Sequence, residues 1–265
     1  MKLDMQKIYI DSRFRTAGSK SETDFNVELP RSFNVPDGVV AHIDDIVIPV
    51  SWSTIDERNQ NCHVRMYCGG TIAPDKYTFA PANYDGYQFA AEMELNLNYT
   101  ATTFGGAITF GCIYDRDENM FSVSVSDERL DSLKISAPFK MEFLTDEAIS
   151  TGSDPNTINT IIRNRVLTFI TEADMYTCYL DLFQTRNLYL TSSALCSYDT
   201  VSNFGMDTIV KKIPCTAGYN KMICLSSGST LDGLDVSKRT LRFIDFKLVD
   251  SSFRTIPLHG NHFSF

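Results

Sequence analysis

The chain has 265 residues, of which 43% are hydrophobic and 12% aromatic, and its 33 acidic and 24 basic side chains give a formal net charge of −9. This length can bury a sizeable core, and the composition excludes disordered, collagen-like and low-complexity chains. The acidic balance argues against a protein whose main task is to coat DNA or RNA, because that affinity comes from Lys and Arg that neutralise phosphates. We expect a soluble globular protein with one large all-β domain or two modest domains.

The first residues, MKLDMQKIYID, place charges where the apolar segment of a secretory leader would lie. No window of the sequence approaches the roughly 18 apolar residues of a membrane span. Without a leader, the odd number of cysteines predicts reduced thiols in a cytosolic compartment. None of the seven forms a C-x-x-C pair: Cys62, Cys68, Cys112, Cys178, Cys196, Cys215 and Cys224. Cys62 and Cys68 would share one strand face too far apart for a disulfide, and we interpret them as small core residues.

Residues 1–22 are predicted to form an exposed N-terminal arm. They carry five basic and three acidic side chains on an otherwise acidic chain, and the segment 12–23 has Phe14 as its only large apolar residue. Two interpretations remain open: a solvated terminus, or an arm that docks on an acidic partner or on packaged nucleic acid and becomes ordered only on assembly.

Three strands are expected next. Apolar and polar side chains alternate without exception over residues 24–29, which predicts a half-buried strand closed by Pro30. Residues 39–52 are rich in Val and Ile and predict a longer strand, and a third is expected over 61–68. The pair Gly69-Gly70 then marks a change in the character of the sequence.

Residues 70–172 are predicted to form an inserted small α+β domain. Apolar side chains at helical spacing predict a helix over 84–97: Tyr84, Tyr87, Ala91 and Leu95. Alternation predicts two strands, at 121–125 and 137–143. The pair Asp154-Pro155 predicts the start of a second helix, with its apolar stripe at Ile158, Ile161, Ile162 and Val166.

After residue 175 only β patterns return. Five strands are expected, at 179–190, 207–214, 219–226, 240–250 and 255–265, with turns that include Asn203-Phe204-Gly205. Together with the three earlier strands they make eight, the number in a jelly roll. The predicted fold class is therefore mainly β: an eight-stranded single jelly roll, an antiparallel β-sandwich, split over residues 23–69 and 173–265 by the α+β insertion.

A search for chemistry in the sequence finds no convergent site. The four histidines are scattered, and His259 and His262 would point to opposite faces of a strand. Glycine-rich phosphate loops and nucleophile elbows are absent from the sequence. We therefore predict no enzyme activity and no catalytic, cofactor-binding or metal-binding residues. One alternative stays open, a cysteine hydrolase hidden in the insertion, which would need a thiol with a pKa well below about 8.5.

Six strings carry a further signal: IYIDSRFR (8–15), TDFNVELP (23–30), DDIVIPVSW (44–52), RNLYLTSS (186–193), IVKKIP (209–214) and LHGNHFSF (258–265). In this order they resemble the minor capsid, or penton, proteins of virophages and polinton-like viruses. The resemblance covers both parts of the predicted jelly roll and is weaker in the insertion.

The resemblance implies a structural virion protein without enzyme activity. Its subunits would assemble as homopentamers at the fivefold vertices of an icosahedral capsid and contact the double jelly-roll major capsid protein. The protein would be made in the host cytoplasm and reside in the virion. The insertion would form an outer domain, and whether it contacts a host receptor stays open. Contact with nucleic acid would be made only by the basic arm. The alternative is a jelly-roll attachment protein that binds a receptor or carbohydrate outside a capsid shell.

Overall fold

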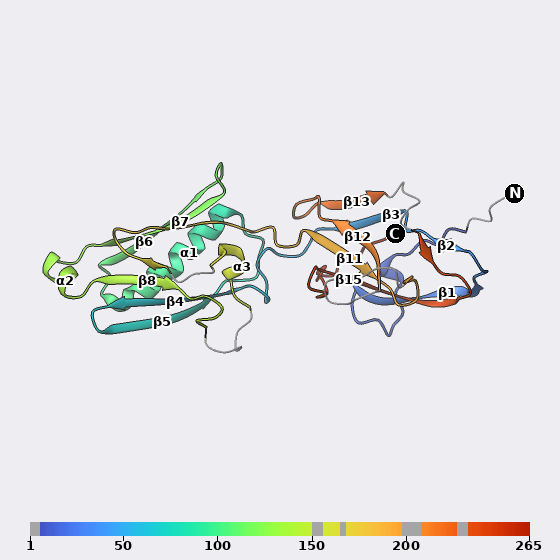
Figure 1. Cartoon of the computed structure of the whole chain (residues 1–265), viewed down its shortest axis with the longest axis horizontal. Helices are drawn as coiled ribbons and strands as arrows, with labels where there is room; N and C mark the ends of the chain where they lie inside the picture. Colours follow the sequence, from blue (N-terminus) through green and yellow to red (C-terminus); the bar gives the residue numbers. More distant parts are fainter. Residues whose placement is uncertain (1–5, 150–155, 165–167, 198–207, 227–232) are drawn as a thin grey trace. The chain divides into compact units, whose positions relative to one another are not determined.

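The computed structural model describes residues 6–149, 156–164, 168–197, 208–226 and 233–265, and it divides into two compact units (Figure 1). Unit 1 comprises Met1–Trp52 and Thr185–Phe265, and unit 2 comprises Ser53–Gln184. Each unit has its own hydrophobic core. The chain is mainly β, which confirms the predicted fold class, and unit 2 extends beyond both ends of the insertion expected at residues 70–172. None of the described helices is long and apolar enough to cross a membrane.

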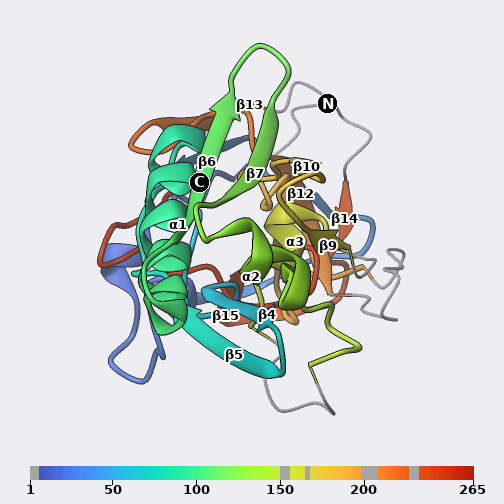
Figure 2. The same ribbon diagram turned by 90° about the vertical axis from the view of Figure 1, so that its left-hand side faces the viewer.

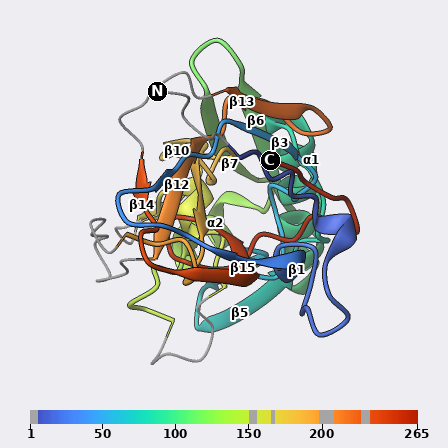
Figure 3. The ribbon, with the colours of Figure 1, turned by 90° about the vertical axis from the view of Figure 1, so that its right-hand side faces the viewer.

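Unit 1 contains eight strands within its described residues, and every pairing between them is antiparallel. One sheet has the order β1-β15-β11-β12, while β13 pairs with β3 and β14 with β2. Figure 1 and Figure 3 show the β1-β15 side and the β13-β3 side on opposite sides of this unit, as in a jelly-roll sandwich. The bounds are β1 (Asp24–Asn34), β2 (Val40–Ala41), β3 (Asp45–Pro49), β11 (Asn187–Thr191), β12 (Ile209–Pro214), β13 (Met222–Ser226), β14 (Leu234–Asp235) and β15 (Thr240–Val249).

The N- and C-terminal segments of unit 1 extend the β13-β3 ladder. Ser264 bridges Val47 of β3 on one side and Asp11 on the other. The Ile10 amide donates to the Phe265 carbonyl at 2.8 Å, and the Phe265 amide donates back to the Ile10 carbonyl at 2.9 Å. These bonds place the C-terminal segment between β3 and the segment that contains Ile10.

Two expectations about these segments need correction. The arm expected to be exposed over residues 1–22 has buried side chains at Ile10 and Ser12, because the pairing with the C-terminal segment covers them. The strand expected over residues 255–265 is present only as isolated bridges. Its ladder is interrupted because His259 and Gly260 turn the chain with φ angles of 51° and 81°.

Phenylalanine rings tie the C-terminal segment to the four-stranded sheet. On β1 the alternation places Phe25, Val27 and Leu29 in the core, with Phe25 only 1% exposed. The Phe25 ring lies 5.7 Å from the ring of its cross-strand partner Phe246 and 5.6 Å from that of Phe263. Aromatic pairs in this distance range contribute beyond the area that they bury.

Strand β1 continues beyond Pro30, where the sequence predicted its end. Glu28 pairs with Phe243 and Phe33 pairs with Leu241, so residues of β1 between these pairs bulge out of the ladder. A proline cannot donate a hydrogen bond to a ladder, which explains the interruption at this position. The chain then pairs with β15 again, so the proline interrupts the strand and does not end it.

The described residues of unit 2 form two antiparallel sheets, of order β5-β4-β8-β9 and β10-β7-β6, around a shared core. The first sheet turns Cys62, Val64 and Met66 of β4 inward, where they meet the inner side chains of the second sheet. The bounds are β4 (Asn61–Cys68), β5 (Thr71–Thr78), α1 (Gly86–Ala101), β6 (Ile108–Asp115), β7 (Met120–Asp127), α2 (Asp131–Ser136), β8 (Phe139–Phe143), α3 (Asn159–Ile162), β9 (Phe169–Ile170) and β10 (Tyr176–Tyr179). Two 3₁₀ turns complete the description, η1 (Ser12–Phe14) in unit 1 and η2 (Thr102–Phe104) in unit 2.

Helix α1 begins with a capping box at Asp85. The Asp85 carboxylate accepts a hydrogen bond from the Gln88 amide at 2.8 Å, and the Gln88 side chain accepts one from the Asp85 amide at 3.1 Å. The helix buries Phe89, Met93 and Leu97 in the core of unit 2. The helix was predicted from a different stripe, whose members Tyr87, Ala91 and Leu95 lie on its exposed side.

Side chains of α1 also cover the free edge of β6. The Asn98 amide group accepts a hydrogen bond from the Phe110 N–H at 2.7 Å and donates one to the Phe110 carbonyl at 3.0 Å. The Glu94 carboxylate accepts a bond from the Cys112 N–H at 2.8 Å. An unpaired strand edge would otherwise present a template for pairing with another chain, so α1 closes this side of unit 2.

Three predicted strands are placed or divided differently in the structure. Residues 61–68 form β4, which pairs with β5 and β8 in unit 2 and is not the third strand of the jelly roll. Residues 39–52 form two strands because β2 pairs with β14 while β3 pairs with β13. Residues 179–190 include the end of β10 and most of β11, and the chain passes from one unit to the other between them.

The second predicted helix is short. It is observed only as α3, whose Ile161 and Ile162 are buried as its stripe predicted. Its predicted start at Asp154-Pro155 and the stripe residue Val166 lie outside the described residues. The turn expected at Asn203-Phe204-Gly205 also lies outside them.

Candidate functional surfaces

The structure does not bring the histidines together as metal ligands. His259 lies in a turn and not on a strand, so the expected opposition of His259 and His262 across a strand is wrong. The His262 Nδ1 atom lies 3.2 Å from the Ser12 hydroxyl. His42 is exposed in unit 1, and His63 lies on β4 in unit 2. Within the described ranges, no group of three or more His, Cys, Asp or Glu side chains is arranged to hold a metal ion.

All seven cysteines are thiols, and their burial differs. Cys62 is buried as expected for a small core residue, whereas Cys68 is only partly buried. Cys112 and Cys196 are also buried, and Cys224 is exposed. Burial raises the pKa of the Cys178 thiol to about 12, and burial also raises the pKa of Cys112. A cysteine nucleophile needs a lowered pKa, so neither of these unit 2 thiols has the electrostatic environment that the hydrolase alternative requires.

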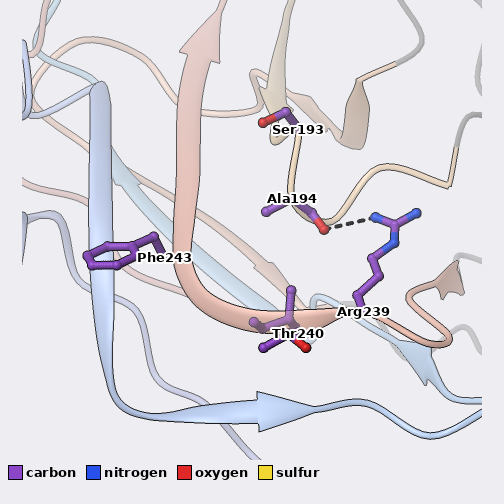
Figure 4. A pocket seen from close by; sticks show the side chains of 6 residues that line it. Ser193, Ala194, Arg239, Thr240 and Phe243 are labelled. Atoms are coloured by element: carbon purple, nitrogen blue, oxygen red, sulfur yellow. Dashed lines mark hydrogen bonds between the residues drawn. The ribbon is translucent and has the colours of Figure 1, made fainter.

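A hollow of about 400 Å³ opens on unit 1 next to the loop that follows β11 (Figure 4). The Arg239 guanidinium donates to the carbonyls of Ala194 at 2.8 Å and Cys196 at 2.7 Å. From the other side, the Asp245 carboxylate accepts hydrogen bonds from the Ser193 and Ala194 amides. The residues that line the hollow are Ser193, Ala194, Arg239, Thr240, Leu241 and Phe243.

Arg239 and Asp245 therefore fix the position of the loop that follows β11 through their hydrogen bonds to its backbone. Phe243, which is 58% exposed, lines the same hollow as Ser193 and Thr240. A fixed loop next to an exposed ring suits contact with another surface, because little conformational entropy is lost when such groups bind. This is a candidate contact surface on the jelly roll.

A second candidate surface is the outer face of the β5-β4-β8-β9 sheet, which we call the cationic face. Cross-strand pairing places Arg65 opposite Glu142, and Tyr67 opposite Lys140. Glu142 likewise pairs with Phe169 of β9. The cationic face is defined by Arg65, Tyr67, Lys76, Lys140, Glu142 and Phe169, three cations and one carboxylate.

The centre of the cationic face is a buried carboxylate under a cation. Glu142 accepts hydrogen bonds from the Tyr67 hydroxyl at 2.5 Å and from Arg65 at 3.3 Å. Burial raises the pKa of Tyr67, and the hydrogen bond to Glu142 raises it further, so the phenol stays protonated. The Lys140 ammonium lies 4.0 Å from the centre of the Phe169 ring and 4.9 Å from that of Tyr67.

A third candidate surface is the exposed side of α1, which we call the acidic stripe. It presents Tyr87, Leu95 and Tyr99, which are 57%, 65% and 78% exposed. The sequence of α1, GYQFAAEMELNLNYTA, holds Glu92 and Glu94 and no basic residue. The acidic stripe therefore consists of exposed apolar side chains with glutamate carboxylates next to them.

The sequence pattern marked one of these surfaces, because it predicted the helix that carries it, but it did not show whether that surface faces the core or the solvent. The spacing of Tyr87, Ala91 and Leu95 was visible, but the pattern does not say which of two apolar stripes on a helix faces the core. The cationic face could not be found in the same way, because strand pairing brings β8 and β9 beside β4, which lies some distance earlier in the sequence.

Comparison with known proteins gives a result at the level of the fold. No protein-family model and no curated protein matches the sequence. A solved structure, the selenomethionine-labelled mavirus penton protein, is similar with a TM-score of 0.52 and 7% sequence identity. The similarity covers 97% of this chain and 96% of that chain, so both units take part in it. The chain therefore has the fold of the mavirus penton protein along almost its whole length.

Proposed function

We propose that this chain is a penton subunit, a minor capsid protein that assembles as a homopentamer at the fivefold vertices of an icosahedral capsid. The observation that carries the proposal is the shared fold, which matches over 97% of this chain, both units included, and over 96% of the mavirus penton protein. The resemblance of strings at both ends of the sequence to penton proteins supports it independently.

The strand pairing and ring packing of unit 1 support a structural role in a shell. Both terminal segments are paired into one layer of the sandwich, and rings on β1 and β15 pack on the C-terminal segment. Such a sandwich keeps its side surfaces in fixed positions, which a contact repeated by rotation requires. In this role the subunit contacts the major capsid protein around the vertex and resides in the virion.

Two measurements test the proposal. Light scattering on the purified protein should give a mass five times that of the 29.9 kDa chain. Electron microscopy of particles that contain a tagged chain should place the tag at fivefold vertices. A monomer that is still found at vertices agrees with a penton that assembles only among neighbouring capsomers.

Other outcomes contradict the proposal. A chain that is absent from particles, or one that occupies the faces of the shell, is not a penton. A trimer that binds glycans and is not part of the shell would instead support the attachment alternative. The hollow beside Phe243 and the cationic face would then be the surfaces to examine for the ligand.

A further inference from the structure

Unit 2 carries two surfaces of complementary chemistry. The acidic stripe of α1 combines exposed Leu95 and Tyr99 with the carboxylate of Glu92. The cationic face combines the rings of Tyr67 and Phe169 with the ammonium of Lys140. Each surface thus offers apolar groups next to charge, and the charges have opposite signs.

The two surfaces lie on different sides of unit 2. Helix α1 packs on the inner side of the β5-β4-β8-β9 sheet, where the Tyr77 hydroxyl lies 3.3 Å from the Met93 sulfur, and its exposed stripe points away from the core. The cationic face is the opposite, outer face of the same sheet. Figure 2 shows α1 along one side of the unit and β4 and β5 along another. One copy can therefore offer its acidic stripe to a second copy while a third copy occupies its cationic face.

The Lys140 ammonium is the charged group of the cationic face that can form an ion pair with another copy. It stacks on two rings, and it makes no ion pair within the part of the chain that the structure describes. Arg65, in contrast, is already hydrogen-bonded to Glu142. The Asn96 side-chain amide donates to the Glu92 backbone carbonyl at 2.8 Å and to the Glu92 carboxylate at 3.3 Å. The carboxylate can therefore accept a further hydrogen bond from another donor.

We infer that unit 2 makes head-to-tail contacts between copies of this chain, in which the acidic stripe of one copy docks on the cationic face of the next. The contact joins two different surfaces, and such a heterologous contact closes into a ring when its rotation permits. Leu95 and Tyr99 pack against the Tyr67 and Phe169 rings, and Glu92 pairs with Lys140. The inference rests on the proposed penton function, because that function supplies a ring of identical subunits, and it assigns unit 2 a part in holding the ring.

The test measures self-association of the full chain by analytical ultracentrifugation over a range of concentrations. Leu95→Asp and Lys140→Glu should each raise the midpoint concentration of association at least tenfold, since they place charge into an apolar contact or oppose Glu92. Tyr179→Asp and Arg116→Glu are matched controls. Tyr179 is 55% exposed on β10 and Arg116 is exposed in the β6-β7 turn, so both should leave association unchanged.

The exchange variant Glu92→Lys with Lys140→Glu separates a direct contact from a change in folding. It should recover most of the association that Lys140→Glu loses, while thermal melting shows that each variant is folded. A failure of this rescue, or equal weakening by the two controls, overturns the contact. Unchanged association together with loss of binding to an acidic glycan would show that the cationic face takes a carbohydrate instead.

The outcome for the penton function is separate. A wild-type chain that reaches fivefold vertices but associates independently of Leu95 and Lys140 overturns this contact and leaves the penton function intact. A chain that associates through these residues but never enters particles upholds the contact and overturns the penton function.

Discussion

Three Asp-x-Arg sequences build the same hydrogen-bonded ring. Two of them, Asp11-Ser12-Arg13 and Asp127-Glu128-Arg129, lie in different surroundings. In each, the arginine donates from its backbone amide and its guanidinium to the aspartate two residues earlier. The Arg13 side chain is 63% exposed, whereas that of Arg129 is 10% exposed above an almost buried Asp127. Since water screens the first pair and not the second, the two pairs should differ greatly in their contribution to stability.

The first prediction compares these arginines. Arg129→Met should lower the free energy of unfolding by roughly 3 kcal/mol, because it leaves a buried carboxylate without its partner. Arg13→Met, the matched control, should change it little. Denaturant unfolding of both variants measures the difference, and an equal effect of the two substitutions would contradict the assignment of Asp127 as a buried charge.

The cost of Arg129→Met should also depend on pH. The hydrogen-bonded Arg129 guanidinium holds the pKa of Asp127 below its ordinary value, which is about 3.9 in an unfolded chain. A lowered folded-state pKa stabilises the protein fully above the unfolded pKa, and the stabilisation is lost as the pH falls through the folded pKa. The gap between wild type and Arg129→Met should therefore narrow in acid. A gap that stays constant down to about pH 2 would contradict this sign.

Thiol reactivity gives a second residue-scale prediction. Burial raises the pKa of Cys178 to about 12 and that of Cys215 to about 11, whereas Cys224 is exposed. In native protein at about pH 8, iodoacetamide should modify Cys224 first, because the thiolate is the reactive form. Mass spectrometry of samples taken at increasing times locates the modified residues. Unfolded protein, in which burial protects none of the thiols, is the control. Rapid native labelling of Cys178 or Cys112 would revive the cysteine hydrolase alternative.

Among the elements, the cover that α1 gives to β6 is open to a direct test. Asn98→Ala removes both hydrogen bonds to Phe110 and should lower the free energy of unfolding by about 1 to 2 kcal/mol. Hydrogen exchange of the Phe110 amide should become faster. The control Asn96→Ala removes contacts only within the helix and should leave that amide unaffected. Equal exchange in both variants would show that α1 does not protect the edge.

The elements also show what a sequence pattern can specify. Alternation located β1, β7 and β8 because each of these strands has one face in a core and one face outside. It failed for β2 and β3, since a continuous run of Val and Ile does not reveal that its two halves pair with different strands. The pattern is local, whereas the choice of a pairing partner is made by the whole sandwich.

The same reasoning explains the candidate surfaces. The cationic face exists only because pairing brings Arg65, Tyr67, Lys140 and Phe169 side by side, and nothing local in the sequence records that arrangement. The periodicity of α1 was sufficient to predict the helix but insufficient to orient it. Phe89, Met93 and Leu97 face the core because they pack against the inner side chains of the two sheets. That packing depends on unit 2 as a whole.

At the scale of the whole molecule, the predicted number of eight jelly-roll strands is correct for the described residues, but two of the eight predicted strands are not strands of unit 1. Eight strands are described in unit 1, but residues 61–68 belong to unit 2 and residues 255–265 form only bridges. The division of residues 39–52 and the addition of β14 restore the count. Strand number is therefore weaker support for the architecture than the bridges that join Ser264 to Val47 of β3 and to Asp11.

The last prediction concerns the independence of the two cores. Leu190 is fully buried in the core of unit 1 and Met141 in that of unit 2. Truncation of either to alanine leaves a cavity and should cost about 2 to 5 kcal/mol. Because each core is built from its own unit, Leu190→Ala should speed hydrogen exchange in β11 and β15, and Met141→Ala should speed it in β4 and β8. Each variant serves as the control for the other, and faster exchange in all four strands with either substitution would show that the two cores unfold as one.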